Sequence, residues 1–193
     1  MNFENYVDSS IKNLESLKNQ RFQEVFQSAA ELLLRTIANN GAILVCGNGG
    51  SHSDAQHFAG ELVNYFTIPH KALRVITLGT NSTVASAWSN DHSYEEQFAR
   101  EVSAYGNDHS LLIGITTSGK SRNVNKAFEK AMELGMGTLA ITSTKAVSKL
   151  PLNLDVILDV PIDETHKIQE LHVVIYHALC IYVEENLPKD FLI

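Results

Sequence analysis

Cysteine and proline are scarce in this chain, and long apolar runs are missing. The 193 residues include only two cysteines, Cys46 and Cys180, and four prolines. Two cysteines in apolar surroundings provide no disulfide framework, which favours a reducing compartment. No apolar run approaches roughly 18 residues, and no basic-then-apolar signal segment opens the chain, so neither a membrane span nor a membrane partner is expected. We therefore expect a soluble, cytoplasmic protein.

Positive charge is also in deficit. The formal net charge is −7, which argues against a nucleic-acid partner, because binding to a phosphate backbone depends on clustered Lys and Arg. Hydrophobic residues make up 44% and charged residues 19% of the chain, as in ordinary globular proteins. Repeats, low-complexity segments and Gly/Ser/Pro-rich linkers are missing. The sequence therefore predicts a single domain over residues 1–193.

The first 40 residues have a helical pattern. Apolar residues recur at three- and four-residue spacing from Ile11 to Leu34, and Asn40-Gly41 is a typical helix stop. A long amphipathic lead-in of this kind must bury its apolar stripe against the rest of the domain or against another copy of the chain. We expect residues 1–40 to form N-terminal helices used for packing or oligomerisation.

From residue 41 onward short apolar runs alternate with helical stretches. Alternation of this kind predicts right-handed βαβ crossovers and a parallel sheet with helices on both faces, an α/β fold. The predicted strands are 42–46, 74–78, 110–115, 137–141 and 154–160. The predicted helices are 54–65, 83–88, 94–103, 123–134 and 165–186.

The stretch from Ile43 to Glu61 carries the strongest signal. A buried strand leads into Gly47-Asn-Gly-Gly50, where positive φ and close approach to a ligand cost little. A helix follows, with Ser51 or Ser53 as its expected N-cap. Free N–H groups at a helix start can hold an anion. The alternative is that the glycines only form a tight turn.

His57 and Glu61 are spaced four residues apart, so they share one face of this helix, next to the expected anion pocket. A His/Glu pair in that position suits proton transfer on a phosphorylated substrate. On the last predicted helix Gln169, His172 and His177 interrupt an apolar surface. A zinc-like ion accepts imidazole nitrogen together with carboxylate or amide oxygen. Gln169 and His177 are separated by roughly 12 Å of helix rise, so one ion reaches both only from between them, or one comes from a neighbouring subunit.

A second hydroxyl-rich loop follows the strand at 110–115. Its hydroxyls resemble a phosphate nest at a helix start, although an ordinary capped turn would look the same. Two such loops at the carboxyl ends of parallel strands would face one crevice and favour a phosphosugar pocket. Between the two loops, Asn90 and Asp91 could hydrogen-bond to the hydroxyls of a sugar, or they could simply cap a helix. The loop hydroxyls belong to Thr116, Thr117, Ser118 and Ser121; we interpret His52, His70, His92 and His109 as surface or loop residues.

These stretches together resemble the bacterial phosphoheptose isomerases, members of the sugar-isomerase (SIS) family. Each piece alone is weak, but they occur in family order over nearly the whole chain after the N-terminal helices. The matching segments are Cys46-Gly-Asn-Gly-Gly-Ser-His-Ser-Asp-Ala-Gln-His-Phe-Ala-Gly-Glu61, Asn90-Asp91 with Phe98–Val102, Thr116-Thr-Ser-Gly-Lys-Ser121, and Lys167–His172 through His177.

The resemblance implies an SIS-type fold, a five-stranded parallel sheet flanked by helices, in a homotetramer with sites near subunit contacts. It further implies one Zn²⁺ per subunit, a phosphate loop after the third strand and a sugar-binding turn at the first. The implied zinc ligands are His57, Glu61, Gln169 and His177. The implied substrate-binding residues are Asn48, Gly49, Gly50, Ser51, Asn90, Asp91, Thr116, Thr117, Ser118, Ser121 and Gln169.

The implied reaction converts the ketose sedoheptulose 7-phosphate to D-glycero-D-manno-heptose 7-phosphate, a precursor for lipopolysaccharide and related surface glycans. Moving a proton between C1 and C2 through an enediol needs a base, an acid and a group that holds the developing oxyanion. The resemblance assigns Glu61 as base and His177 as acid. Glu61 cannot be a tightly bound metal ligand and a free base in the same step. The sequence leaves both roles open.

Two positions depart from the family pattern. Asn64-Tyr65 replaces an arginine that often follows the glutamate, and Ser143-Thr-Lys-Ala146 replaces a glycine-rich turn. An isomerase of a different sugar phosphate is therefore one alternative. The other is a non-catalytic SIS protein that acts by protein binding, of the type that associates with a replication initiator, although such relatives lack the glutamate and the last-helix histidine.

Overall fold

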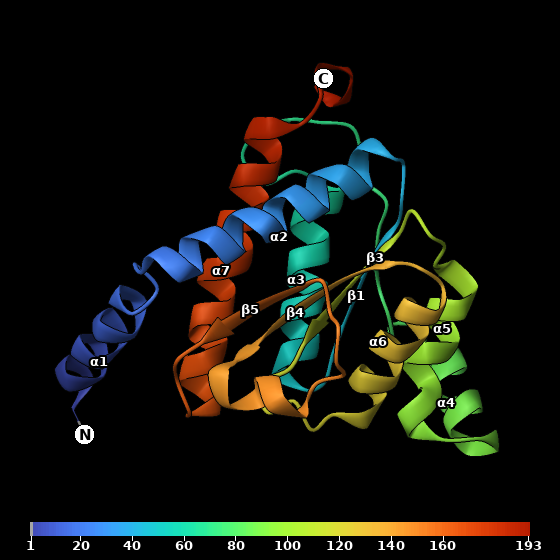
Figure 1. The fold of residues 1–193 in the computed structure, drawn as a ribbon, viewed down its shortest axis with the longest axis horizontal. Coiled ribbons are helices and arrows are strands. Elements are labelled where there is room, and N and C mark those ends of the chain that lie inside the picture. The colour runs from blue at the N-terminus through green and yellow to red at the C-terminus, as the bar shows by residue number, and fades with distance from the viewer. Residues whose placement is uncertain (1) are drawn as a thin grey trace.

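The computed structural model describes residues 2–193 and contains a central sheet with helices on both faces (Figure 1). The strands are β1 (Ile43–Gly47), β2 (Val75–Thr77), β3 (Leu111–Ile115), β4 (Gly137–Ser143) and β5 (Val156–Val160). The α-helices are α1 (Phe3–Glu15), α2 (Gln20–Ala38), α3 (Gly50–Val63), α4 (Ser82–Asp91), α5 (Gln97–Tyr105), α6 (Arg122–Glu133) and α7 (Thr165–Asn186). Short 3₁₀ turns lie at Tyr94–Glu96, Thr144–Lys149 and Lys189–Phe191.

All five strands are parallel and follow the order β2-β1-β3-β4-β5. The fold class predicted from the sequence is thus confirmed. Because the strand order reverses direction between β1 and β3, the helices that follow these two strands, α3 and α6, pack on opposite faces of the sheet. In doubly wound sheets a crevice opens at that point, outside the carboxyl ends of the strands, and ligands bind there.

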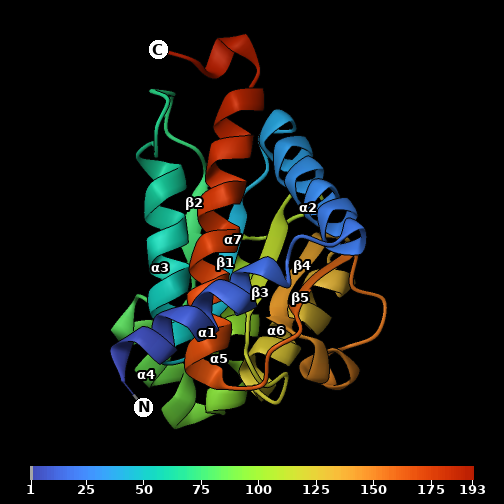
Figure 2. The same ribbon diagram turned by 90° about the vertical axis from the view of Figure 1, so that its left-hand side faces the viewer.

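Side chains that alternate along the strands form two separate cores. Odd-numbered residues of β1 and β3, such as Ile43 and Ile113, pack with α2, α3 and α7. Even-numbered residues, such as Leu44 and Leu112, pack with α5 and α6. Figure 2 shows α3 and α7 side by side on the first of these faces. The continuous burial of the strands explains why the sequence shows unbroken apolar runs rather than alternation.

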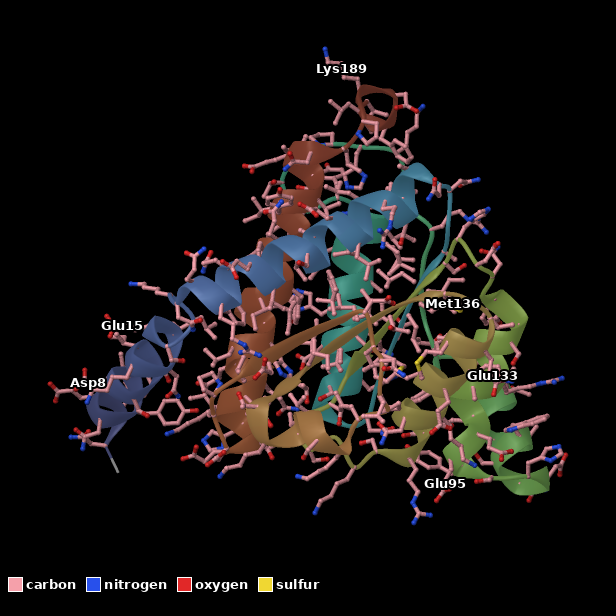
Figure 3. The ribbon with its side chains drawn as sticks, viewed as in Figure 1. Asp8, Glu15, Glu95, Glu133, Met136 and Lys189 are labelled. Atoms are coloured by element: carbon pink, nitrogen blue, oxygen red, sulfur yellow. The ribbon has the colours of Figure 1, made fainter. Side chains whose placement is uncertain are left out.

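The N-terminal helical segment is divided into two helices. α1 ends at Glu15. Asn19 then accepts a hydrogen bond from Phe22 N and caps the start of α2. α2 packs on the sheet, whereas α1 extends from the body and buries none of its residues (Figure 1). Its outer side carries Asp8 and Glu15 (Figure 3).

The expected N-cap of α3 is wrong. The helix begins at Gly50, with Gly49 in the cap position and no side-chain cap hydrogen bond, so neither Ser51 nor Ser53 fills that role. Gly49 has φ of +56°, a conformation that glycine adopts without strain. The backbone thus turns into the helix two residues earlier than a cap at Ser51 would require. Among residues 2–193, no helix combines the length and apolarity that crossing a membrane would require.

Candidate active site

The loops after β1 and β3 meet at the crevice that the strand order predicts. A cavity of about 320 Å³ lies beside the glycine turn. Gly47 cannot carry a side chain, because a Cβ there would lie 2.5 Å from the carbonyl oxygen of Ser51. The close turn leaves room for a ligand next to the start of α3. The residues that line the cavity are Gly47, Asn48, Gly49, His52, Gly79, Tyr94, Gln97 and Phe98.

A reciprocal amide pair joins the two loops. Asn48 Nδ2 donates to Asn123 Oδ1 at 2.8 Å, and Asn123 Nδ2 donates back to Asn48 Oδ1 at 2.9 Å. Tyr94 OH donates to the same Asn48 oxygen at 2.8 Å. Asn123 is buried at the start of α6 and also receives the N–H of Val124. Asn48 is therefore held in one orientation by Asn123 and Tyr94, neither of which was predicted from the sequence.

The second predicted loop, Thr116–Ser121, is held from below by the end of β4. Thr142 Oγ1 donates to Thr116 O at 2.6 Å, and Ser143 Oγ donates to Thr117 O at 3.0 Å. Gly119, with φ of +65°, turns the chain toward α6. Ser121 is the N-cap of α6, and its hydroxyl makes no capping bond. The Ser121 hydroxyl is thus free to bind a ligand oxygen, and the helix start adds unpaired N–H groups.

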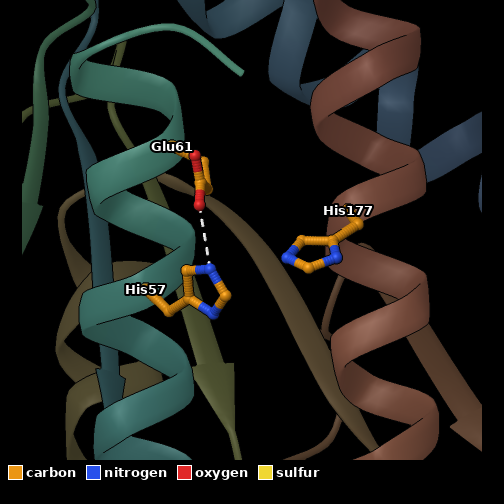
Figure 4. A group of neighbouring side chains, drawn as sticks. All are labelled: His57, Glu61 and His177. Atoms are coloured by element: carbon orange, nitrogen blue, oxygen red, sulfur yellow. Dashed lines mark hydrogen bonds and ion pairs between the residues drawn. The ribbon is translucent and has the colours of Figure 1, made fainter. Parts of the chain in front are cut away.

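His57, Glu61 and His177 converge from two helices. His57 Nε2 lies 2.8 Å from Glu61 Oε1 on α3, and His177 faces them from α7 (Figure 4). One nitrogen or oxygen atom from each of the three side chains lies within 4.8 Å of the others. The structure thus brings together the two predicted catalytic residues and three of the four predicted metal ligands within a single chain.

The environment of His177 suits a neutral imidazole. Phe66 stacks on its ring at 5.0 Å between centroids, and the His57 ring lies edge-on at the same distance. Burial lowers the pKa of His177, and the neighbouring His57 lowers it further, against the opposing charge of Glu61. Within the described chain, His177 Nε2 is buried without a hydrogen-bond partner. Two imidazole nitrogens and a carboxylate oxygen at these distances are a fitting donor set for a zinc ion.

One buried residue, Tyr176, contacts His57 from behind, and a buried carboxyl, Asp54, lies near both. Tyr176 OH lies 2.9 Å from His57 Nδ1. Burial first, and then the charge of Asp54, raise the pKa of the Tyr176 phenol, which keeps it protonated. Asp54 lies one turn before His57 and is itself buried, and this burial raises its pKa to about 6. Sequence reasoning missed Tyr176, because an apolar-looking position on α7 gives no sign of a contact across 119 residues.

Gln169 lies apart from the three converging side chains. A Cβ on Gly50 would meet Gln169 Nε2 at 2.3 Å, so the amide lies against the first residue of α3. That end of α3 carries the glycine turn, and His177 lies roughly 12 Å of helix rise further along α7. Within one chain, Gln169 is thus placed beside the glycine turn.

The remaining predicted polar residues have mixed outcomes in position. Asn90 and Asp91 end α4, are exposed and hydrogen-bond to each other at 2.8 Å. His70 lies in the loop between α3 and β2, as one of the two predicted alternatives has it, but it is not at the surface: it is 2% exposed and its Nε2 lies 3.3 Å from Glu184 Oε1. Glu184 also accepts the N–H groups of Phe66, Thr67 and Ile68. This cluster holds the loop that brings Phe66 onto His177.

Comparison with known proteins places the chain in a family. The family model of the SIS domain matches residues 5–143. The chain is 47% identical to a phosphoheptose isomerase of Helicobacter pylori (strain P12) over 175 residues, 91% of this chain and 88% of the relative. It is 47% identical to that of Campylobacter jejuni (strain 81116) over 158 residues, 82% of this chain and 84% of the relative. The chain belongs to the phosphoheptose isomerases of the SIS domain family.

Solved structures of the family have the same fold. Phosphoheptose isomerase GmhA from Neisseria gonorrhoeae superimposes with a TM-score of 0.85 at 34% identity, covering 94% of this chain and 96% of that one. A phosphoheptose isomerase from Francisella tularensis gives 0.86 at 33% identity, covering 95% and 96%. The sugar isomerase domain of an RpiR transcription factor from Sphaerobacter thermophilus gives 0.64 at 18% identity, which shows a shared SIS fold alone.

Proposed function

We propose that the protein is an aldose–ketose isomerase that converts sedoheptulose 7-phosphate to D-glycero-D-manno-heptose 7-phosphate. Membership of the phosphoheptose isomerases supports this reaction. The observation that carries the proposal is the convergence of Glu61 and His177 from separate helices, with Glu61 on the helix that starts at the glycine turn beside the cavity. A non-catalytic SIS protein would not need that pair.

The residues divide the chemistry between binding and proton transfer. Ser118, Ser121 and the N–H groups at the start of α6 would hold the phosphate, and the turn from Asn48 to Ser51 would bind sugar hydroxyls, with Asn90 and Asp91 nearby. Glu61 would remove the proton from one carbon of the C1–C2 pair and return it to the other. His177 would pass a proton between the two oxygens, from a neutral imidazole whose nitrogen can both donate and accept.

We further propose a zinc ion at His57, Glu61 and His177, one per subunit. Because Gln169 of the same chain lies beside Gly50, a fourth ligand from Gln169 would come from a neighbouring subunit. When bound, such an ion polarises the carbonyl and hydroxyl oxygens of the substrate. The unpartnered Nε2 of His177 and the mixed nitrogen and oxygen donor set support this site. Glu61 then serves as ligand or base at different steps.

We propose a cytoplasmic homotetramer whose product enters heptose synthesis for lipopolysaccharide or related surface glycans. An exposed apolar stripe on α1 supports assembly: Phe3 is 81% and Ile11 49% exposed. An apolar groove between α2 and α7 lies next to the end of this helix. Assembly would place several copies of the crevice near subunit contacts.

Replacement of Glu61 by glutamine tests the function. Glu61→Gln keeps the shape of the side chain and removes its basicity, so turnover of sedoheptulose 7-phosphate should fall at least ~100-fold, the ordinary contribution of a general base. Glu15→Gln, on the exposed side of α1, is the matched control and should retain wild-type turnover. Aldose formation is followed by nuclear magnetic resonance. Unchanged turnover in Glu61→Gln removes Glu61 from the chemistry, and an inactive wild type overturns the proposed reaction.

A further inference from the structure

Tyr176 is a fully buried tyrosine whose hydroxyl reaches the proposed metal site from behind. Its ring stacks on Phe58 at 5.4 Å with 22° between the planes, and meets the edge of His57 at the same distance. The hydroxyl lies 2.9 Å from His57 Nδ1. Tyr176 on α7 thus contacts a donor residue on α3, and it directly precedes His177 in the chain.

The hydrogen bonds of His57 define the direction of this contact. Its other nitrogen, Nε2, lies 2.8 Å from Glu61 Oε1. A carboxylate only accepts hydrogen bonds, so Nε2 carries the proton. In the neutral ring Nδ1 is then an acceptor, and the hydroxyl of Tyr176 donates to it.

A ligated metal ion at Nε2 requires the opposite arrangement. Nε2 must then present its lone pair to the ion, and the ring proton lies on Nδ1. A hydroxyl can accept that proton in the same position in which it previously donated, whereas a carboxylate or carbonyl could only accept. Tyrosine at this place therefore supports both states of His57 without movement of either ring.

We propose that Tyr176 is a positioning residue whose hydroxyl holds the ring of His57 with Nε2 toward Glu61 and His177, donating to Nδ1 in the metal-free protein and accepting from it when a cation binds. The second half of this proposal rests on the proposed function, since it requires zinc at His57. The first half concerns the chain alone.

Substitution by phenylalanine separates this role from packing. Tyr176→Phe keeps the ring against Phe58 and deletes the hydroxyl. Removal of a partner behind a metal-ligating histidine typically weakens metal affinity 10–100-fold. Tyr182→Phe is the matched control, because its hydroxyl lies on the same helix and accepts from Gln27 Nε2 at 2.6 Å, away from the site. Zinc affinity of the full chain is measured by competition with a chromophoric chelator.

We expect Tyr176→Phe to bind zinc at least about 10-fold more weakly than wild type, and Tyr182→Phe to bind it equally well. Equal affinity in wild type and Tyr176→Phe overturns the role toward the metal while the proposed isomerase stands. The nitrogen-15 chemical shifts of the His57 ring provide a second readout. They are measured on metal-free protein at a pH above the ordinary imidazole pKa of ~6.5. We expect a protonated Nε2 in wild type and a mixture of tautomers in Tyr176→Phe. A protonated Nδ1 in metal-free wild type overturns the assignment even if no zinc binds.

Discussion

His172 illustrates how one buried side chain can set a property of the whole fold. It has no exposed surface, its Nε2 lies 3.3 Å from Thr142 O, and its Nδ1 has no partner within residues 2–193. Burial lowers its pKa to about 4, against the partly opposing hydrogen bond to Thr142. The native state therefore holds His172 neutral, whereas the unfolded chain protonates it near its ordinary pKa.

We predict that His172 makes the protein less stable in mild acid. Between pH ~6.5 and about 4 the unfolded chain binds the proton and the native state does not, so stability falls as pH falls, by up to about 3 kcal/mol. His172→Gln should lose less stability over this window, as measured by urea unfolding at several pH values. Burial raises the pKa of Asp54 to about 6, so Asp54 makes the protein more stable as the pH falls, opposite to His172. Both proteins contain Asp54, so the difference between the wild-type and variant pH profiles isolates the effect of His172. Parallel pH profiles for the two proteins would contradict the prediction.

At the level of single residues, the sequence predicted three side chains that the structure brings together, His57, Glu61 and His177, but missed the residues that hold their surroundings. His57 and Glu61 were found because four-residue spacing places them on one helix face. Tyr176 and Asn123 contact their partners across 119 and 75 residues. Such contacts depend on which strands are neighbours, and a residue pattern within one element carries no information about that.

The two loops at the carboxyl end of the sheet act as one element because the Asn48–Asn123 amide pair connects them. Asn48 follows β1, and Asn123 begins α6 after β3. Loss of the pair would release the glycine turn from the loop at 116–121. Each hydrogen bond of this kind makes a net contribution of ~1 kcal/mol to the stability of the folded state.

We predict that Asn123→Ala lowers kcat/KM about 5- to 30-fold, the effect of losing 1–2 kcal/mol of alignment. Tyr94→Phe, which removes a single bond to Asn48, should have a smaller effect in the same direction. Tyr105→Phe, at the end of α5, is the control and should leave kcat/KM unchanged. Steady-state kinetics with sedoheptulose 7-phosphate measure the three variants. A larger loss in Tyr105→Phe than in Asn123→Ala would be incompatible with this role of the pair.

The end of α7 holds the loop that follows α3. Glu184 is 2% exposed and accepts from three consecutive N–H groups and from Thr67 Oγ1 at 2.7 Å. Burial alone raises the pKa of Glu184, but the bonds from Thr67, Phe66 and Ile68 outweigh it and lower the pKa below the ordinary value. The negative charge is thus matched by its donors.

We predict that Glu184→Gln lowers the free energy of unfolding by about 2–4 kcal/mol, because an amide replaces one acceptor oxygen with a second donor facing the same N–H groups. Glu185→Gln is the matched control on the adjacent, exposed position and should change stability by less than about 0.5 kcal/mol. Urea unfolding monitored by circular dichroism measures both. Equal effects at the two positions would rule out a specific role for the Glu184 cluster.

At the level of elements, strand positions were predicted to within about two residues at most ends, because parallel strands buried on both faces have continuous apolar runs. α7 was predicted with its observed bounds, since its stripe is long and regular. The sequence did not predict the break between α1 and α2 or the start of α3. Both depend on backbone turns set by one capping residue, at Asn19 and Gly49.

On the scale of the whole molecule, α1 carries an apolar stripe that the rest of its own chain does not cover. It contacts α7 through polar groups, since Ser10 Oγ and Tyr6 OH both donate to Glu170. Val7, Ile11 and Leu14 remain between 38% and 49% exposed. A stripe of this kind on a helix that buries nothing in its own chain is typical of a subunit contact.

We predict that Ile11→Lys shifts the protein from tetramers toward smaller species, because a charge enters the apolar contact. The tetramer would contain four chains of 21.3 kDa each. Lys12→Gln, the neighbouring exposed position, is the control and should retain the wild-type mass. Size-exclusion chromatography with light scattering measures the mass. A tetramer that persists in Ile11→Lys would locate the contact elsewhere, and a monomeric wild type would remove the proposed assembly.

The 22 residues of α7 carry Gln169 at the glycine turn, His177 at the proposed ion and Glu184 at the loop beyond. One inserted residue would turn everything downstream by about 100° and shift it by about 1.5 Å. Insertions and deletions within this helix would therefore misalign Gln169, His177 and Glu184 relative to one another, although single replacements on its outer side leave the spacing intact. The spacing along α7 therefore fixes the separation between the glycine turn and the proposed ion, and it constrains how this scaffold can diverge.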